Sequence, residues 1–213
     1  MITTIISTET LQLPQGAVVR LPGTWQEYQQ LTQQRGDRSI PRIKFRHGEI
    51  LLMAPLPIHG RDAHILSQVV IPLLDYCDRE YDAFTPITMD LPEESGLEPD
   101  FCFYIDHWSA ISGKHRINWQ QDPPPDLVIE VDVTSYSDVN DYLPYRVPEV
   151  WLWKRQTLQI YRLQNQQYIL AEQSQFLPEF DLPDLIQTCL QESYERNTST
   201  AIRNLRQRLS ARD

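Results

Sequence analysis

Two acidic side chains stand inside the most apolar segment of this sequence, Leu127–Val133 (LVIEVDV). A continuous run of aliphatic residues of this length is typical of a central β-strand that is covered on both faces of its sheet. Glu130 lies in the middle of the run, where a buried carboxylate is costly unless it is hydrogen-bonded, paired or bound to a cation. The segment therefore predicts a buried sheet that carries a polar site.

Helical periodicity is visible in several other parts of the chain. Residues 24–34 (TWQEYQQLTQQ) predict a short helix with Thr24 or Gly23 as its cap. Apolar residues recur at steps of three and four over residues 60–79, which predicts an amphipathic helix that Pro72 should kink. A short helix over Val139–Tyr145 and one or two helices over Pro183–Arg212 complete the helical predictions.

Short apolar segments between these helices predict the remaining strands. Arg42–Arg46 and Glu49–Met53 are expected to form a hairpin, while the two prolines of residues 54–60 (APLPIHG) predict a loop. Further strands are predicted at Phe84–Leu91, Asp100–Ile105, Glu149–Trp153, Leu158–Arg162 and Tyr168–Ala171. Strands and helices mixed in this order indicate an α/β or α+β domain built around a mixed sheet.

The length of 213 residues and a hydrophobic content of 41% fit one globular domain. We expect a single domain over residues 1–213, with an N-terminal extension (1–22) and a C-terminal helical extension (183–213). No segment approaches the roughly 18 apolar residues needed to cross a bilayer, and MITTIISTETLQL lacks the basic start and cleavage site of a signal peptide.

The three cysteines, Cys77, Cys102 and Cys189, are far apart and lie in apolar surroundings. An odd number with this spacing predicts reduced core residues of a cytoplasmic protein, and neither a disulfide framework nor a metal site. The absence of a membrane segment and of a signal peptide agrees with that location.

Asp100 opens a predicted strand directly after Pro99, and Asp132 has the same parity as Glu130. Side chains alternate along a strand, so Asp132 and Glu130 are expected on one face of the sheet. If Asp100 lies on an adjacent strand, about 4.8 Å away, these acids form a plausible site for Mg²⁺. The alternative interpretation is that Asp100 caps a turn and that Asp132 lies near a strand end in water.

Five sequence blocks together resemble the Uma-type restriction endonucleases, a bacterial family of the PD-(D/E)xK nuclease superfamily. The blocks are Trp25, Tyr28 and Leu31 at helical spacing, HGEILLMAPLPIHG (47–60), EPDFCFYI (98–105), PPDLVIEVDVTS (124–135) and YRVPEVWLW (145–153). Each block alone is weak, whereas their order and spacing are specific. The resemblance implies a restriction-endonuclease-like fold, in which helices flank a mixed central sheet.

The resemblance also implies roles for particular residues. Asp100 matches the acid of the PD element and Glu130 that of the (D/E)xK element, so both are expected to bind Mg²⁺, or Mn²⁺ in its place, together with the carbonyl of Val131. Glu49 and His59 match polar positions expected near the site. Alternatively, Glu49 is a solvent-facing strand residue and His59 starts a helix and donates to a local carbonyl.

The lysine of the (D/E)xK element is missing, because its position is Asp132. The resemblance implies a lysine shortly before Tyr142 instead, yet no lysine occurs between Lys114 and Lys154. Arg146 is the nearest basic group in that segment, but an arginine stays protonated and cannot act as a general base. Lys44, on an earlier strand, is another candidate, and Asp132 is a candidate third metal ligand.

Two functions follow from these observations. The first is a Mg²⁺-dependent DNA endonuclease that acts through Asp100, Glu130 and Asp132, with Glu49 and His59 nearby, as a homodimer by analogy with the superfamily. The second is a catalytically inactive nuclease fold that serves as a DNA-binding or protein-interaction module. The net charge of −10 disfavours strong unaided DNA binding, unless a basic patch or a dimer cleft exists.

Overall fold

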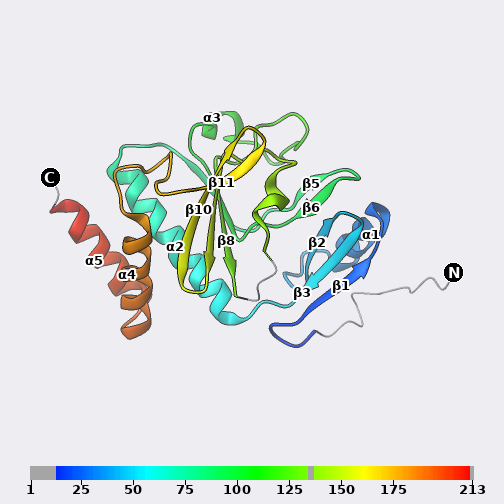
Figure 1. Cartoon of the computed structure of the whole chain (residues 1–213), viewed down its shortest axis with the longest axis horizontal. Coiled ribbons are helices and arrows are strands. Elements are labelled where there is room, and N and C mark those ends of the chain that lie inside the picture. Colours follow the sequence, from blue (N-terminus) through cyan, green and yellow to red (C-terminus); the bar gives the residue numbers. More distant parts are fainter. Residues whose placement is uncertain (1–12, 134–136, 212–213) are drawn as a thin grey trace. The chain divides into compact units, whose positions relative to one another are not determined.

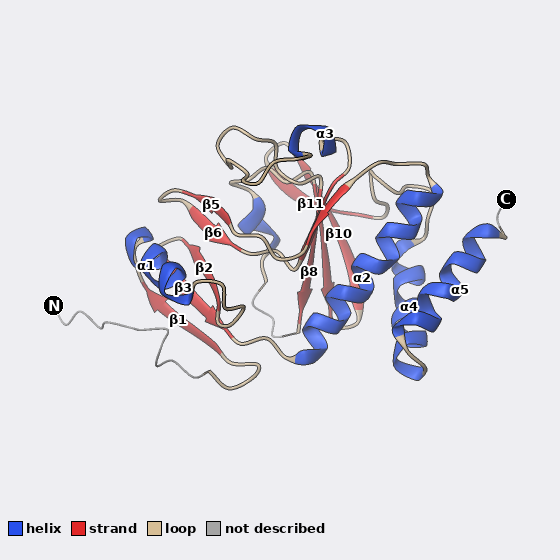
Figure 2. Ribbon diagram, turned by 180° about the vertical axis from the view of Figure 1, so that it is seen from behind, coloured by secondary structure: helices blue, strands red, loops and turns tan. Residues whose placement is uncertain are grey.

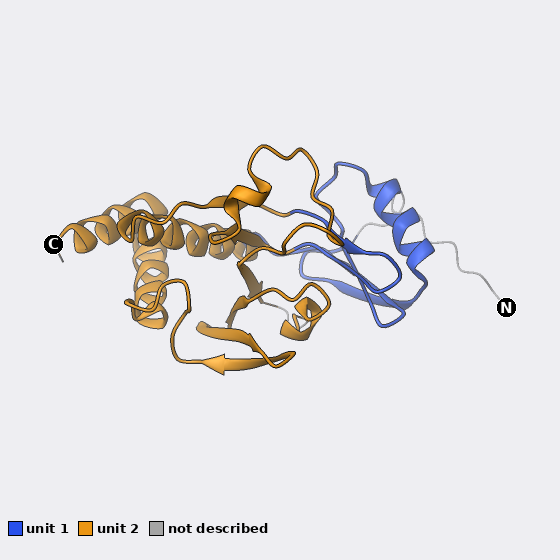
Figure 3. Cartoon of the chain, turned by 90° about the horizontal axis from the view of Figure 1, so that it is seen from above, with its two compact units in different colours: residues 1–57, 87–98 blue, residues 58–86, 99–213 orange. Residues whose placement is uncertain are grey.

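The computed structural model describes residues 13–133 and 137–211 of the chain. The chain divides into two compact units, one containing the residues up to Pro57 together with 87–98, and the other containing 58–86 and the residues from Pro99 onward (Figure 3). Each unit has its own sheet. The single domain expected over residues 1–213 stays a prediction.

The described part of the first unit is a five-stranded antiparallel sheet with one helix. The strand order is β1-β3-β2-β6-β5. Its elements are β1 (Val18–Pro22), α1 (Trp25–Arg35), β2 (Arg42–Arg46), β3 (Glu49–Met53), β5 (Met89–Leu91) and β6 (Ser95–Leu97). Tyr28 and Leu31 of α1 pack on Ile43 and Phe45 of the hairpin β2–β3, which confirms that hairpin and the helix before it.

The start of α1 is fixed by a reciprocal cap. The Thr24 side chain accepts a hydrogen bond from the Glu27 backbone N–H, and the Glu27 carboxylate accepts one from the Thr24 backbone N–H at 2.7 Å. Thr24, and not Gly23, is therefore the cap. At the other end of α1, Arg35 forms a two-pronged ion pair with Glu98, with N–O distances of 2.9 and 2.6 Å.

The second unit contains a six-stranded mixed sheet in the order β11-β10-β9-β8-β7-β4. Its strands are β4 (Asp82–Phe84), β7 (Phe101–Tyr104), β8 (Leu127–Asp132), β9 (Glu149–Lys154), β10 (Thr157–Gln164) and β11 (Gln167–Ala171). Strands β8 and β9 pair in parallel, and the other neighbours pair antiparallel. Every residue of β8 is buried, as its apolar sequence predicted.

Helices α2 (Pro57–Tyr76), α4 (Leu182–Glu195) and α5 (Thr198–Ser210) contribute to the core on one face of this sheet (Figures 1 and 2). The unit also contains a short helix, α3 (Trp108–Ile111), and a 3₁₀ turn, η1 (Val139–Tyr142). One hydrophobic core joins Leu66 of α2 to Ile129 of β8, Trp151 of β9 and Ile186 of α4. The mixed α/β architecture agrees with the predicted fold class.

Two element predictions were wrong, both at prolines. The segment 54–60 is only partly a loop, because α2 begins at Pro57; a proline is well suited to the first position of a helix, where its missing N–H would have no partner. The single strand predicted over Phe84–Leu91 is two strands, β4 and β5, in different sheets. Pro86 lies between them, and proline disfavours a continuous ladder.

Other predictions differ in detail. Helix α2 continues through Pro72 and ends at Tyr76, the short helix after β8 is a 3₁₀ turn, and the C-terminal helices number two in the described part of the chain. Strands β1 and β6 and helix α3 were not predicted, because three to five residues carry too little periodicity. The first twelve residues of the expected N-terminal extension, and Arg212, lie outside the described residues.

Within residues 13–133 and 137–211, no helix combines the length and the apolar character needed to span a bilayer. The three cysteines are unpaired, as expected; Cys102 and Cys189 are buried, and Cys77 is half-buried.

Replacing Gly96 by alanine is expected to destabilise the first unit. A β-carbon there would lie 2.3 Å from Cζ of the buried Tyr28 ring. We expect a loss of about 1–3 kcal/mol in the free energy of unfolding, measured by chemical denaturation. Gly60→Ala in α2 is the control, since a β-carbon there meets nothing within 4 Å and helix propensity favours alanine by about 1 kcal/mol. Equal stability of the two variants would contradict this packing.

Candidate active site

The pairing of β7 with β8 brings the two principal acids together. Phe101 of β7 lies opposite Ile129 of β8 in an antiparallel register. Extended by one residue, this register places Asp100 opposite Glu130. Directly opposed residues of an antiparallel pair have β-carbons about 4.5–5.5 Å apart and point to the same face. The two carboxylates therefore emerge side by side at one end of the sheet.

The acids lie on the sheet face opposite the helical core. Ile129 and Val131 belong to that core, so their neighbours Glu130 and Asp132 point the other way. Asp100, Glu130 and Asp132 are 3%, 7% and 5% exposed. The burial of Asp132 rules out the interpretation that it lies at a strand end in water. Three buried carboxylates in one place require compensating partners.

Both carboxylate oxygens of Asp100 have protein partners. Oδ2 accepts a hydrogen bond from the backbone N–H of Val131 at 2.8 Å, and Oδ1 lies 2.7 Å from Nε2 of His59. An ionised carboxylate only accepts hydrogen bonds, so Nε2 of His59 donates in this contact. His59, in the first turn of α2, thus contacts Asp100 directly. Val131 contacts it through its N–H, and a metal-binding role for its carbonyl stays a prediction.

Tyr142 of η1 is the partner of Glu130. Its hydroxyl donates a hydrogen bond to Oε1 of Glu130. Burial raises the pKa of the Tyr142 hydroxyl well above its ordinary value, and the Glu130 carboxylate raises it further. The hydroxyl consequently stays protonated and serves as a neutral donor. The sequence had singled out Tyr142 only as a marker for the missing lysine.

A lysine does reach the acids, from the neighbouring strand. Lys154 ends β9 at the position that pairs with Asp132 in the parallel register, and its Nζ lies 2.7 Å from Oδ2 of Asp132. Paired residues of adjacent strands point to the same face, so the ammonium group lies on the face that carries Glu130. No local sequence pattern predicts this contact, because the two residues are far apart in the chain.

The other predicted residues are placed differently. Glu49 begins β3 of the first unit and is half-buried, and Lys44 is buried in β2 of the same unit. Both belong to a unit other than the one that holds Asp100 and Glu130, so their grouping with these acids stays a prediction. Arg146 lies in an exposed turn after η1, with a φ of 57°.

No cluster of three or more His, Cys, Asp or Glu residues with metal-binding geometry occurs in the part of the chain that the structure describes. A magnesium ion does not need such a cage, because it usually keeps several waters and binds through one or two carboxylates together with substrate phosphate. The opposed carboxylates of Asp100 and Glu130 meet that requirement with hard oxygen donors. The residues present therefore fit Mg²⁺ as a partly hydrated ion.

A mixed sheet with two opposed acids at the end of adjacent strands, and a lysine beside them, defines the class of nuclease-like α/β folds. The sequence profile of the family Uma2, described as "Putative restriction endonuclease", matches residues 25–194. The chain belongs to this family. The match agrees with the resemblance carried by the five sequence blocks, and it supports nuclease function in general.

The fold is similar to that of a solved structure from Anabaena variabilis ATCC 29413, described as a "putative nuclease belonging to DUF820". The two share 20% sequence identity, the TM-score is 0.50, and the similarity covers 88% of this chain and 99% of the other. At this identity the likeness shows the fold alone. A comparison with curated proteins gives no significant match.

Removing the Tyr142 hydroxyl is expected to destabilise the protein, because a buried carboxylate loses a donor. We expect Tyr142→Phe to lower the free energy of unfolding by about 1–3 kcal/mol. Tyr161→Phe is the matched control, since that hydroxyl donates to the half-buried Gln159 side chain at 3.3 Å. Chemical denaturation at neutral pH measures both. If both variants lose the same free energy of unfolding, the bond to Glu130 contributes no more to stability than the bond to Gln159.

Proposed function

We propose that this protein hydrolyses phosphodiester bonds of DNA, with Mg²⁺ held by Asp100 and Glu130. The observation that supports this most directly is the register of β7 and β8, which sets the two carboxylates opposite one another on one face. Membership of a restriction endonuclease family supports the same reaction. When bound, Mg²⁺ or Mn²⁺ would polarise the scissile phosphate and lower the pKa of a coordinated water.

Lys154 is the residue that we assign to the place of the missing lysine. Its ammonium group lies against Asp132, the position at which the (D/E)xK element has its lysine. The positive charge thus comes from β9 instead of β8 but lies on the same face of the sheet. There it would orient the attacking water and stabilise the negative charge that develops on the phosphate. Its side chain is 24% exposed, so substrate can reach it.

Two further residues position the acids. His59 donates to Asp100 from the start of α2, and Tyr142 donates to Glu130 from η1. Each donor restricts the rotation of one carboxylate while leaving acceptor capacity for a cation, because an ionised carboxylate has about four lone-pair sites. A site whose ligands are held by neighbouring donors loses less entropy when an ion binds.

The second candidate function is a DNA-binding or protein-interaction module without catalytic activity. The observation that favours it is the pairing of each acid with a protein donor: Asp100 with His59, Glu130 with Tyr142 and Asp132 with Lys154. A network satisfied in this way is stable without any ion.

Cutting both strands of a duplex needs two centres, which we propose that two copies of the chain supply.

Neutralising either opposed acid is expected to abolish metal-dependent cleavage. Asp100→Asn and Glu130→Gln keep the side-chain size but remove a negative ligand, so nicking of plasmid DNA with Mg²⁺ or Mn²⁺ should fall at least about 100-fold. Calorimetry should show Mn²⁺ binding to the wild type and a weaker affinity for both variants. If Glu130→Gln cleaves plasmid DNA at the wild-type rate and no metal binding is detected, the cleavage does not come from these acids. That result would favour the inactive module.

Exchanging the residues at positions 132 and 154 tests whether the lysine can act from either strand. Lys154→Asp should abolish cleavage, because it removes the ammonium group and places a second acid beside Asp132. The double variant Asp132→Lys/Lys154→Asp restores the ion pair in reverse and puts the lysine at the usual motif position, so cleavage should recover. Cleavage rates and melting temperatures of wild type, single and double variants measure this.

Two lysine controls sharpen this experiment. Lys114→Met removes a surface lysine that pairs with Asp122, and it should cleave like the wild type. Lys44→Met tests the lysine of the first unit. If Lys44→Met abolishes cleavage and Lys154→Met does not, the assignment of Lys154 is wrong. A folded double variant that remains as inactive as Lys154→Asp would also overturn it.

A further inference from the structure

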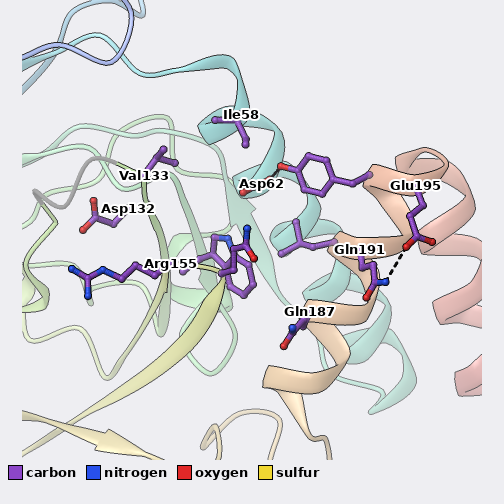
Figure 4. A pocket seen from close by; sticks show the side chains of 12 residues that line it. Ile58, Asp62, Asp132, Val133, Arg155, Gln187, Gln191 and Glu195 are labelled. Carbon is purple, nitrogen blue, oxygen red and sulfur yellow. Dashed lines mark hydrogen bonds between the residues drawn. The ribbon is translucent and has the colours of Figure 1, made fainter.

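A pocket of about 680 Å³ lies beside the candidate active site in the second unit. It is bounded by the first turns of α2, the carboxyl ends of β8 and β9, and one face of α4 (Figure 4). Asp132, Val133 and Arg155 line one side of it, and Gln187, Gln191 and Glu195 line the other. Its volume is in the range of small-molecule sites.

The pocket lies at the same strand ends as the site: Asp132, at the end of β8, lines it, while the side chains of Asp132 and Glu130 point to the sheet face opposite the helices. Glu130 is two residues earlier on the same strand, about 6.6 Å away along its axis. A DNA strand with one base in the pocket therefore reaches the opposed carboxylates by passing around the end of β8. The pocket is thus positioned to hold part of the molecule whose phosphate is cut.

The walls of the pocket combine apolar surface with amide groups. Ile58, Val133 and Tyr194 are 43%, 41% and 46% exposed, which is high for large hydrophobic side chains that share one cavity. Gln187 and Gln191 lie one helical turn apart on the facing side of α4. This combination suits a flat ligand with apolar faces and a polar edge.

The charges of the pocket disfavour an anionic occupant. Asp62, Asp132 and Glu195 line it, against the single guanidinium of Arg155 among its lining residues. Burial raises the pKa of the Asp62 carboxyl above its ordinary value, and the hydrogen bond from Tyr194 offsets only part of this rise. A phosphate group is therefore poorly suited to the interior, whereas a neutral heteroaromatic ring with amino groups on its edge is well suited.

The Tyr194 ring is held in place before any ligand binds. Its hydroxyl donates to Asp62 at 2.5 Å, and the guanidinium of Arg61 lies 4.2 Å from the ring centroid. An aromatic ring fixed in this way offers a stacking surface that loses little entropy on binding. Base–aromatic stacking is worth about 1–3 kcal/mol per base.

We propose that this pocket takes one unstacked nucleobase of the DNA strand, adjacent to the phosphate that the acids act on. The proposal rests on the proposed function and adds a substrate requirement: the protein acts on single-stranded or locally unpaired DNA. The base stacks against Tyr194 and the aliphatic walls, and Gln187 and Gln191 hydrogen-bond its edge, as glutamine amides do with bases. The phosphate stays outside the pocket, on the side of Arg155.

Binding of single nucleotides without metal tests the proposal independently of cleavage. The probes are the four deoxynucleoside 5′-monophosphates and, as a ligand without a base, deoxyribose 5-phosphate, all in EDTA. At least one nucleotide should bind and shift the indole N–H resonance of Trp153, which lines the pocket, whereas deoxyribose 5-phosphate should not. Equal binding of the sugar phosphate and the nucleotides would overturn the proposal.

Filling the pocket is the matched structural test. Gln187→Trp and Gln191→Trp place a large side chain in it from exposed positions of α4, and each should weaken nucleotide binding at least about 10-fold. Gln207→Trp, at an exposed position of α5 outside the pocket, should bind like the wild type. Melting temperatures check that all three variants fold. Unchanged affinity in both folded pocket variants would overturn the proposal.

The two proposals fail in different ways. If cleavage depends on Glu130 but single-stranded DNA is cut equally well by wild type and Gln187→Trp, the pocket proposal is wrong and the nuclease proposal stands. If the nucleotide binds in the pocket, and Glu130→Gln neither loses this binding nor alters cleavage, the pocket stands and the nuclease proposal is wrong.

Discussion

The antiparallel pairing of Phe101 with Ile129 determines where the acids of this protein lie. A shift of one residue in that register would turn every side chain of one strand to the opposite face, and Asp100 would then be directed into the helical core. The apolar packing of Phe103, Ile129 and Val131 under α2 prevents such a shift, because it would expose all of them together. Hydrophobic burial on one face thus fixes the geometry of the carboxylates on the other.

The same strand ends bring together three kinds of chemistry. The opposed carboxylates of Asp100 and Glu130 offer oxygen ligands, and Lys154 offers a positive charge. The pocket that begins at Asp132 offers apolar walls and amide groups. A protein with a net charge of −10 does not attract DNA strongly through its overall field. Recognition of a base in a pocket needs no such field, which is how an acidic protein can select a nucleic-acid substrate.

Much of the fold follows from patterns that depend on neighbouring residues alone. The capped helix after Thr24, the hairpin from Arg42 to Met53 and the buried strand through Glu130 were all predicted, because each has a clear period and clear ends. Strands β1 and β6, and the division of 84–91 between two sheets, were not predicted. Strands of three to five residues obtain their stability from the partners beside them, and sequence patterns do not reveal those partners.

The sequence by itself determined that Asp100 and Glu130 are the acids of interest, because a carboxylate inside an apolar strand must have a partner. Only the tertiary structure decided what the partners are. His59, Tyr142 and Lys154 approach from a helix, a 3₁₀ turn and a parallel strand. Lys154 follows Asp132 by more than twenty residues, and the two meet because β8 and β9 pair in register. Backbone hydrogen bonds between strands can form in many registers, so the burial of apolar side chains from distant parts of the chain selects this one.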